Sequence, residues 1–176
     1  IWLVERWRET YGPEATQKIC EYDQAAPATA VRIGSGASGQ QRSAGPEGIR
    51  FEPGRLLAHA GVVAGDVTRS EAFREHRLII QDEASQLVAL LLGKGKNILD
   101  CCAAPGGKTR ILAQQNPDAA VVAVDLHPHR ARLMRKLVTE ANVRIISGDV
   151  RQMPFSKRFD RILVDAPCSG TGTLAR

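Results

Sequence analysis

The second half of the sequence contains four short apolar runs, each with an aspartate at or near its end, and this pattern restricts the fold most strongly. The runs cover residues 97–102, 120–125, 144–149 and 161–166. Their length and their continuous apolar composition are typical of buried parallel strands. Helical patterns at 108–115 and 128–141 separate them, the second with a core-facing stripe formed by Leu133, Met134, Leu137, Val138 and Ala141. Strands that alternate with helices predict an α/β fold with an open, doubly wound parallel sheet.

Aspartates gather at one predicted edge of this sheet. Ligands of such folds bind beyond the carboxyl ends of the strands, where Asp100, Asp125, Asp149 and Asp165 are expected. One aspartate in this position is typical of a helix cap. Four of them indicate a ligand site.

The segment Asp-Cys-Cys-Ala-Ala-Pro-Gly-Gly-Lys-Thr at 100–109 is predicted to be a nucleotide-binding loop between the first strand and its helix. Glycines let a ligand approach the backbone, and a helix start offers free N–H groups. A phosphate-binding Walker loop would need glycine at Cys102, five residues before Gly107, so ATP or GTP hydrolysis is disfavoured. Asp125 follows Gly107 by eighteen residues, a spacing that suits a ribose-binding acid. The spacing also allows a dinucleotide, but the G-x-G-x-x-G pattern is missing, which favours another adenosine compound.

A second motif, Asp-Ala-Pro-Cys-Ser-Gly-Thr-Gly at 165–172, follows the fourth predicted strand. A thiol in a loop with free backbone N–H groups can have a lowered pKa and attack carbon. The alternative for a lone cysteine is a small buried hydrophobe. The polar, glycine-rich loop favours a reactive Cys168, and its Asp-Ala-Pro-Cys start resembles the Asp-Pro-Pro-aromatic loop of amino-group methyltransferases with cysteine replacing the aromatic residue.

The first half of the chain has a different organisation. A helical pattern over 1–20 breaks at Gly12-Pro13, and short strands are expected at 30–33 and 78–80. Residues 34–48, rich in Gly, Ser and Gln, are predicted to form a flexible loop. A helix over 82–92 is expected to start at the N-cap Asp82 and to bury one side, formed by Leu87, Val88, Leu91 and Leu92.

Composition limits the setting and the partners. The four cysteines form no CxxC pair, and Cys101 and Cys102 would point to opposite faces of a strand, which disfavours disulfides and a metal site and indicates a reducing cytoplasm. No apolar run reaches eighteen residues, so no membrane span is expected. The net charge is +5. Its whole excess lies in residues 81–176, with fourteen basic and nine acidic groups, which favours a nucleic-acid partner. The chain opens on Ile1 without a signal-peptide pattern, as an excised piece would.

In these motifs the sequence resembles the RNA cytosine-5 methyltransferases, most closely the bacterial small-subunit ribosomal RNA methyltransferase B group, also called Sun or Fmu. The resemblance rests on Gln-Asp-Glu-Ala-Ser-Gln at 81–86, the loop at 100–109, Asp125, Gly148-Asp149 and the motif at 165–172. Trp2 to Trp7 and Pro27-Ala-Thr are similar to the passage from the family's helical N-terminal region into a small subdomain. The resemblance implies the end of that helical region at 1–25, a small α+β RNA-binding subdomain at 26–80, and a Rossmann-like methyltransferase domain at 81–176.

The resemblance also implies a site for S-adenosylmethionine and no metal. Ribose and methionine would be held by the loop residues Cys102, Ala103, Ala104, Pro105, Gly106, Gly107 and Lys108. Asp125 would accept the ribose hydroxyls and Asp149 would lie by the adenine. Asp165 would sit between cofactor and cytosine.

In the implied reaction, a thiolate adds to cytosine C6, C5 takes the methyl group, the C5 proton leaves, and the thiol is eliminated. In this family the attacking thiol belongs to a later Thr-Cys-Ser segment, absent from the 176 residues, and Cys168 would assist product release. The sheet would be truncated after its fourth strand. The chain would then be the cofactor-binding half of an enzyme on ribosomal RNA, inactive alone. The alternative is a non-catalytic module that binds S-adenosylmethionine or RNA.

Overall fold

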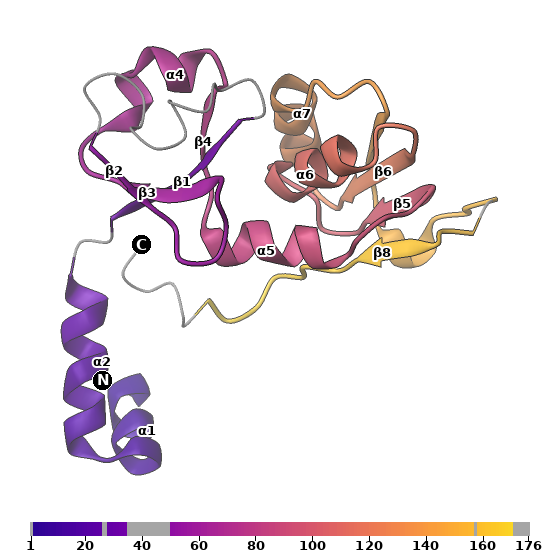
Figure 1. The fold of residues 1–176 in the computed structure, drawn as a ribbon. Coiled ribbons are helices and arrows are strands. Elements are labelled where there is room, and N and C mark those ends of the chain that lie inside the picture. Colours follow the sequence, from indigo (N-terminus) through magenta and orange to yellow (C-terminus); the bar gives the residue numbers. More distant parts are fainter. Residues whose placement is uncertain (1, 26–27, 35–49, 157, 171–176) are drawn as a thin grey trace. The chain divides into compact units, whose positions relative to one another are not determined.

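The computed structural model describes residues 2–25, 28–34, 50–156 and 158–170, which form parts of two compact units (Figure 1). One unit combines residues 1–28 with 168–176, and the other spans residues 29–167. Nearly all of the predicted flexible loop at 34–48 lies outside the described residues. The three-part division inferred from the sequence stays a prediction.

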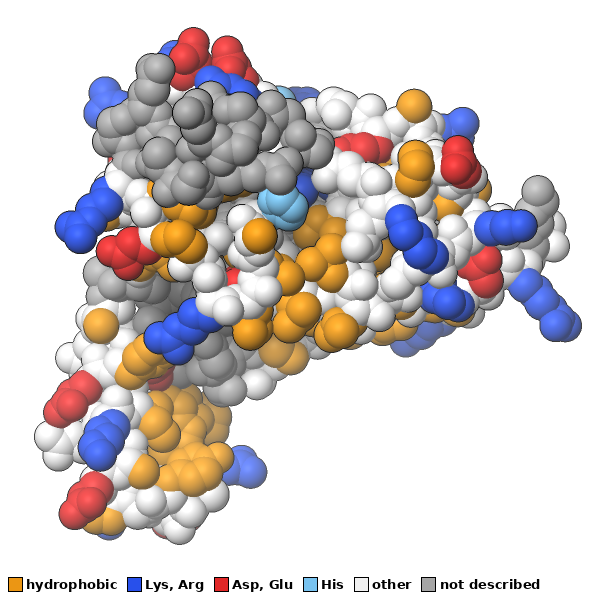
Figure 2. All heavy atoms as spheres, viewed as in Figure 1, with side chains coloured by type: hydrophobic (Ala, Val, Ile, Leu, Met, Phe, Trp, Pro, Cys, Tyr) orange, Lys and Arg blue, Asp and Glu red, His pale blue; other side chains and the backbone are white. Residues whose placement is uncertain are grey.

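The N-terminal segment forms two helices, α1 (Trp2–Tyr11) and α2 (Pro13–Gln24). Gly12 between them has a φ of +82°, a left-handed conformation that ends α1, and Pro13 occupies the first turn of α2. The predicted break is therefore confirmed. Trp2, Tyr11 and Tyr22 are exposed, and Figure 2 shows hydrophobic side chains gathered on this helical pair.

An antiparallel sheet opens the larger unit. It contains β1 (Thr29–Ile33), β2 (Phe51–Pro53), β3 (Ala60–Val63) and β4 (Leu78–Ile80), in the order β2-β3-β1-β4. The 3₁₀ turn η1 (Val67–Arg69) and the short helix α4 (Glu71–Arg74) lie between β3 and β4. The antiparallel sheet, η1 and α4 share one hydrophobic core, which is formed by Val31, Ile33, Val63, Val67, Ala72 and Leu78. The strands predicted at 30–33 and 78–80 are confirmed.

A parallel sheet follows, with β5 (Asn97–Asp100), β6 (Ala120–Asp125), β7 (Val143–Ser147) and β8 (Arg161–Leu163). The strand order is β7-β6-β5-β8, and every neighbouring pair is parallel. The connecting elements are α5 (Glu83–Leu91), α6 (Gly107–Gln115), α7 (Pro128–Leu137) and the 3₁₀ turn η2 (Val150–Gln152). The predicted α/β class and the presence of four parallel strands are confirmed. The predicted ends at 149 and 166 were wrong, because β7 ends at Ser147 and β8 at Leu163.

The period of two along each strand divides the core of the parallel sheet into two faces. On one face, Ile98 and Val121 pack with Leu112 of α6, and Ala123 packs with Met134 of α7. The opposite face is covered by Leu99, Cys101 and Val124 with the partly buried Val122, Ile146, Val150, Met153, Phe155 and Phe159. The central strands β5 and β6 are therefore buried on both sides, which explains their continuous apolar runs. The edge strand β8 was also expected to be buried, but Ile162 is 52% exposed and only Leu163 of this strand is buried.

The prediction for the helix over 128–141 was wrong at its end, because α7 stops at Leu137 and Val138 is extended. Val138 packs close to Gly106, and Glu140 turns back to pair with Arg110 at 3.0 Å. These contacts compete with a further helical turn. Leu133 and Ala141, expected in the core, are exposed.

Two local predictions for the segment 82–102 were also wrong. Asp82 caps α5 as expected, accepting a hydrogen bond from Ala84 N at 2.9 Å, but Val88 and Leu91 are exposed while Gln86 and Ala89 are buried. Figure 2 shows hydrophobic side chains at the surface along α5. β5 ends at Asp100, so the two following cysteines lie in a turn and not on a strand.

Within the described part of the chain, every helix is too short or too polar to cross a membrane.

Candidate functional site

The site lies at the carboxyl edge of the parallel sheet, where the strand order reverses. β5, the first strand of this sheet in the chain, has β6 on one side and β8 on the other. The segments that follow β5 and β8 therefore diverge at this point, which is where open α/β sheets bind ligands. Both sequence motifs leave the sheet here.

Asp100 anchors the loop after β5 to the helix that follows. Only 1% of the residue is exposed, and its Oδ2 accepts a hydrogen bond from Thr109 Oγ1 at 2.7 Å. Burial raises the pKa of Asp100 to about 6, against the opposing effects of the Thr109 hydroxyl and the Lys108 ammonium. This hydrogen bond connects the first and last residues of the ten-residue motif, so Asp100 stabilises the conformation of the loop.

Close packing requires the first glycine of the loop and crowds the second. Gly106 has a φ of +107°, and a Cβ there would lie 2.4 Å from Val138 Cγ2. Gly107 begins α6, and a Cβ there would lie 3.1 Å from Gln81 Nε2. The missing side chains at Gly106 and Gly107 therefore let the loop pack against Val138 and Gln81 where it enters α6.

Asp125 ends β6 and is tied to the same loop. Its Oδ2 accepts a hydrogen bond from Ala104 N at 3.2 Å, and its Oδ1 accepts one from His127 N at 3.0 Å. Only 2% of the residue is exposed. Asp125 and the loop are therefore in direct contact, and their joint role in binding a cofactor stays a prediction.

Arg130, which sequence reasoning missed, bridges Asp125 and the loop. Its Nη1 lies 3.5 Å from Asp125 Oδ2, and its Nη2 donates a hydrogen bond to Ala104 O at 2.7 Å. A ligand that binds the Asp125 carboxylate must share it with Arg130 or displace the guanidinium. The sequence feature that could have indicated Arg130 is its position in the first turn of α7, shortly after Asp125 at the end of β6.

A salt bridge joins the two motifs. Lys108 Nζ lies 2.6 Å from Asp165 Oδ2, between the first turn of α6 and the segment after β8. The Lys108 side chain is 19% exposed and that of Asp165 is 50% exposed. The carboxylate of Asp165 therefore faces solvent at the rim while the lysine holds it from the buried side.

Asp149 lies after β7, next to the end of β6, where Gly148 N donates to Asp125 O at 3.0 Å. Its carboxylate caps η2 by accepting from Arg151 N and is paired with the Arg151 guanidinium at 2.5 Å. These hydrogen bonds lower the pKa of Asp149 to about 2. The carboxylate is therefore ionised and already occupied by a partner.

The cysteines differ in their surroundings. Burial raises the pKa of the Cys101 thiol and of the Cys102 thiol, so neither is prepared as a thiolate. Cys168 is exposed, belongs to the smaller unit, and its Sγ accepts a hydrogen bond from Gly170 N at 3.4 Å. Across the described ranges, no cluster of His, Cys, Asp and Glu has the arrangement of a metal site.

Comparison with known proteins identifies the family of this fold. Residues 87–176 match the family model described as 16S rRNA methyltransferase RsmB/F. The chain belongs to this family. The matched range contains both motifs and the four parallel strands. The chain belongs to a methyltransferase family and has a Rossmann-like sheet. These two observations identify S-adenosylmethionine as the cofactor.

Curated relatives match nearly the whole chain. It is 35% identical over 188 residues to the probable ribosomal RNA small subunit methyltransferase B of Bacillus subtilis, covering 99% of this chain and 42% of the relative. It is 34% identical over 197 residues to ribosomal RNA small subunit methyltransferase B of Vibrio cholerae, covering 99% of this chain and 43% of the relative. The chain thus spans less than half the length of these relatives.

Two solved structures from Pyrococcus horikoshii share the fold. A methyltransferase homolog protein superposes with a TM-score of 0.79 at 26% identity, covering 98% of this chain and 60% of the other. The structure of NSun6 with SFG has a TM-score of 0.80 at 18% identity, covering 94% of this chain and 70% of the other. The architecture is therefore that of known methyltransferase structures.

Proposed function

We propose that this chain is the cofactor-binding half of an RNA cytosine-5 methyltransferase that acts on small-subunit ribosomal RNA. The observation that carries the proposal is the meeting of the loop at 102–108 with Asp125 and Asp165 at one reversal point of the sheet. The family membership and the names of the relatives support the reaction class and the substrate.

The chemical groups at this site suit the binding of S-adenosylmethionine. The backbone at Gly106 and Gly107 carries no Cβ. Each carboxylate oxygen of Asp125 keeps acceptor capacity beyond its backbone hydrogen bonds, provided that the ligand shares Oδ2 with the Arg130 guanidinium or displaces it. We assign the loop Cys102, Ala103, Ala104, Pro105, Gly106, Gly107 and Lys108, together with Asp125 and Asp149, to holding this cofactor. When bound, the cofactor supplies an electrophilic methyl group. SFG, an S-adenosylmethionine analogue in the NSun6 structure, supports this assignment.

Asp165 is proposed to orient the cytosine. A carboxylate can accept a hydrogen bond from the N4 amino group of cytosine. Lys108 fixes one oxygen of Asp165 at 2.6 Å, and the half-exposed side chain leaves the other available to a substrate. The lysine would therefore act as a positioning residue, while Asp165 contacts the base.

The thiol chemistry is divided between this chain and the remainder of a longer protein. Cys168 is proposed to assist product release, and the principal nucleophile is proposed to lie outside the 176 residues. Cys101 and Cys102 are poor substitutes because burial raises the pKa of both thiols. The chain alone would then bind cofactor without turning over. A cytoplasmic location follows from the proposed ribosomal substrate.

Titration calorimetry with S-adenosylmethionine tests the site. Asp125→Ala removes a charged acceptor and should weaken binding by about 1.5–3 kcal/mol, or roughly tenfold to a hundredfold. Asp118→Ala is the matched control, because Asp118 is exposed in the turn before β6. Equal affinity of the Asp125 variant and the wild type would overturn the assignment.

The reaction itself is tested in the full-length protein. Small-subunit ribosomal RNA incubated with protein and S-adenosylmethionine should gain 5-methylcytosine, detected by nucleoside mass spectrometry. Cofactor binding without any methylated cytosine in RNA would instead favour a non-catalytic module.

A further inference from the structure

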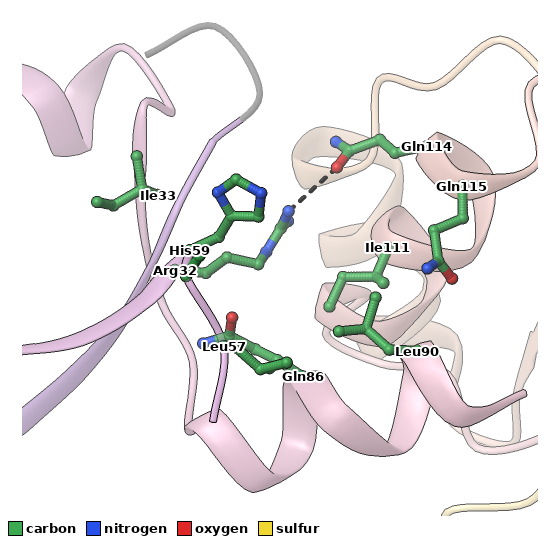
Figure 3. A pocket seen from close by; sticks show the side chains of 10 residues that line it. Arg32, Ile33, Leu57, His59, Gln86, Leu90, Ile111, Gln114 and Gln115 are labelled. Atoms are coloured by element: carbon green, nitrogen blue, oxygen red, sulfur yellow. Dashed lines mark hydrogen bonds between the residues drawn. The ribbon is translucent and has the colours of Figure 1, made fainter. Parts of the chain in front are cut away.

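A second cavity lies within the larger unit, between the antiparallel sheet and helices α5 and α6. Its volume is about 410 Å³, and Figure 3 shows side chains from both sides pointing toward it. Arg32 and His59 come from the antiparallel sheet and its β2–β3 connection, and Leu90, Ile111 and Gln114 come from the two helices. None of the residues assigned to the cofactor lines it.

Arg32 carries a buried positive charge at this cavity. It is 6% exposed, and its Nε and Nη1 donate to the side-chain oxygens of Gln81 at 3.2 Å and Gln114 at 3.0 Å. Both partners are neutral amides. Burial lowers the pKa of Arg32 to about 10, so the guanidinium is still charged at neutral pH.

Among the described residues, the neighbouring charges give Arg32 no direct counter-ion. Arg110 and Glu140 both act on Arg32, but they pair with each other at 3.0 Å. Glu140 also accepts a hydrogen bond from Gln114. A buried charge without a direct counter-ion is costly, and an anion bound at the cavity would relieve that cost.

Two unsatisfied polar atoms belong to this cavity. In the described part of the chain, the buried side-chain atoms without a hydrogen-bond partner are Arg32 Nη2 and Gln115 Oε1, and both residues line it. Buried polar groups without partners are rare in folded proteins, so these two atoms keep hydrogen-bonding capacity that a bound molecule would use. Such a molecule must offer an acceptor to Arg32 and a donor to Gln115.

The remaining wall is apolar and includes Ile33, Leu57, Leu90 and Ile111. The volume lies in the range of small-molecule sites and exceeds what a bare phosphate fills. The cavity therefore suits a ligand with an anionic group at one end and a flat body with a hydrogen-bond donor at the other.

We propose that this cavity binds a nucleotide, with the phosphate on Arg32 and the base against the apolar wall near Gln115. The choice of RNA as the source rests on the proposed function, because a substrate strand crossing from the parallel sheet to the antiparallel sheet would deliver one nucleotide here. A free mononucleotide offers the same chemistry. The cavity thus adds a second nucleotide contact, separate from the cytosine that is methylated.

The test compares cytidine 5′-monophosphate, cytidine and a fluorescent single-stranded RNA oligonucleotide as probes of the full-length protein. Ala58→Glu places a carboxylate at an exposed position of the cavity wall, and Ala58→Gln is its neutral match. Arg32→Met removes the buried charge. We expect the monophosphate to bind at least about tenfold more tightly than cytidine, and Ala58→Glu and Arg32→Met to weaken it about tenfold while Ala58→Gln does not.

The RNA arm separates the two sources. Weaker RNA binding in Ala58→Glu, with an unchanged affinity for S-adenosylmethionine, supports a substrate nucleotide; an effect on the monophosphate alone supports a free nucleotide. If neither probe distinguishes Ala58→Glu from Ala58→Gln, the cavity holds solvent only and the inference is wrong. If the proposed function is wrong, the full-length protein will not methylate RNA, but the binding of cytidine 5′-monophosphate and its dependence on Arg32 and Ala58 will be unchanged.

Discussion

The ammonium of Lys108 lies 2.6 Å from the carboxylate of Asp165 and joins two motifs that are 57 positions apart in the chain. The lysine belongs to the first turn of α6 and the aspartate to the segment after β8. The pair crosses the reversal point of the sheet and links the cofactor loop to the proposed base-contacting residue. This relationship gives the first prediction.

The Lys108–Asp165 pair should contribute little to folding. Its aspartate is 50% exposed, and half-exposed ion pairs are screened by solvent, so a double-mutant cycle with Lys108→Met and Asp165→Asn should give a coupling below about 1 kcal/mol in the free energy of unfolding. Urea unfolding of the four proteins measures it. A coupling of several kcal/mol would assign the pair to stability and not to the site.

Asp100 should make stability depend on pH. Its ordinary pKa is 3.8 and burial raises it to about 6, so between these values the folded protein keeps a proton that the unfolded chain releases. The free energy of unfolding should therefore fall as pH rises from about 4 to about 6 and change no further through this group above that, by up to roughly 2–3 kcal/mol in all.

Asp100→Asn isolates this effect. The amide cannot ionise, and its oxygen can still accept from Thr109 Oγ1. Chemical unfolding at pH 4.5 and pH 7 should show a smaller loss of stability in the variant than in the wild type. Parallel pH curves for the two proteins would contradict the raised pKa.

Gly106 and Gly93 provide a matched test of the loop. Both have left-handed backbones, but a Cβ at Gly93 meets nothing within 4 Å, whereas at Gly106 it would meet Val138 Cγ2 at 2.4 Å. Gly93→Ala should cost about 1 kcal/mol of stability, and Gly106→Ala about 2–4 kcal/mol. Thermal unfolding measures both. Adding Val138→Ala should recover part of the Gly106→Ala loss, and no recovery would disprove the clash.

The sequence predicted the strands well and the helix faces poorly, for a physical reason. The central parallel strands β5 and β6 are covered on both sides, so their apolar runs are continuous and do not depend on knowing the neighbours. A helix face depends on what packs beside it. Leu91 is exposed because α5 instead buries Ala89 and Gln86, and the Gln86 amide donates hydrogen bonds to Val31 O and Gln81 O.

The residues of the candidate site also differ in whether the sequence alone could predict them. Asp125 and the glycine loop were predictable because strand ends and bare backbone follow from local sequence. Arg130 and Arg32 were not, because each acts through contacts distant in the chain: Arg130 with Ala104, 26 residues away, and Arg32 with Gln114, 82 residues away. The end of α7 was missed for the same cause, the long-range pairing of Glu140 with Arg110.

The basic side of α7 should be a solvated surface. Arg132, Arg135 and Lys136 are exposed, and the Arg135 guanidinium already donates to Ile145 O at 3.2 Å. Changing all three to alanine should leave the slope of log RNA affinity against log salt concentration unaltered. A slope reduced by two to three units would show that these residues neutralise phosphates.

Cys168 gives the sharpest test of the proposed chemistry, in the full-length protein. If it assists release, Cys168→Ala should still attack cytosine through the later thiol and transfer the methyl group, but fail to eliminate the enzyme. A protein–RNA adduct that survives denaturing electrophoresis should then accumulate. If Cys168 is instead the nucleophile, no adduct can form. The 176-residue chain alone should neither trap RNA nor methylate it, because Cys101 and Cys102 have raised pKa values; turnover by this chain would overturn the division of roles between the thiols.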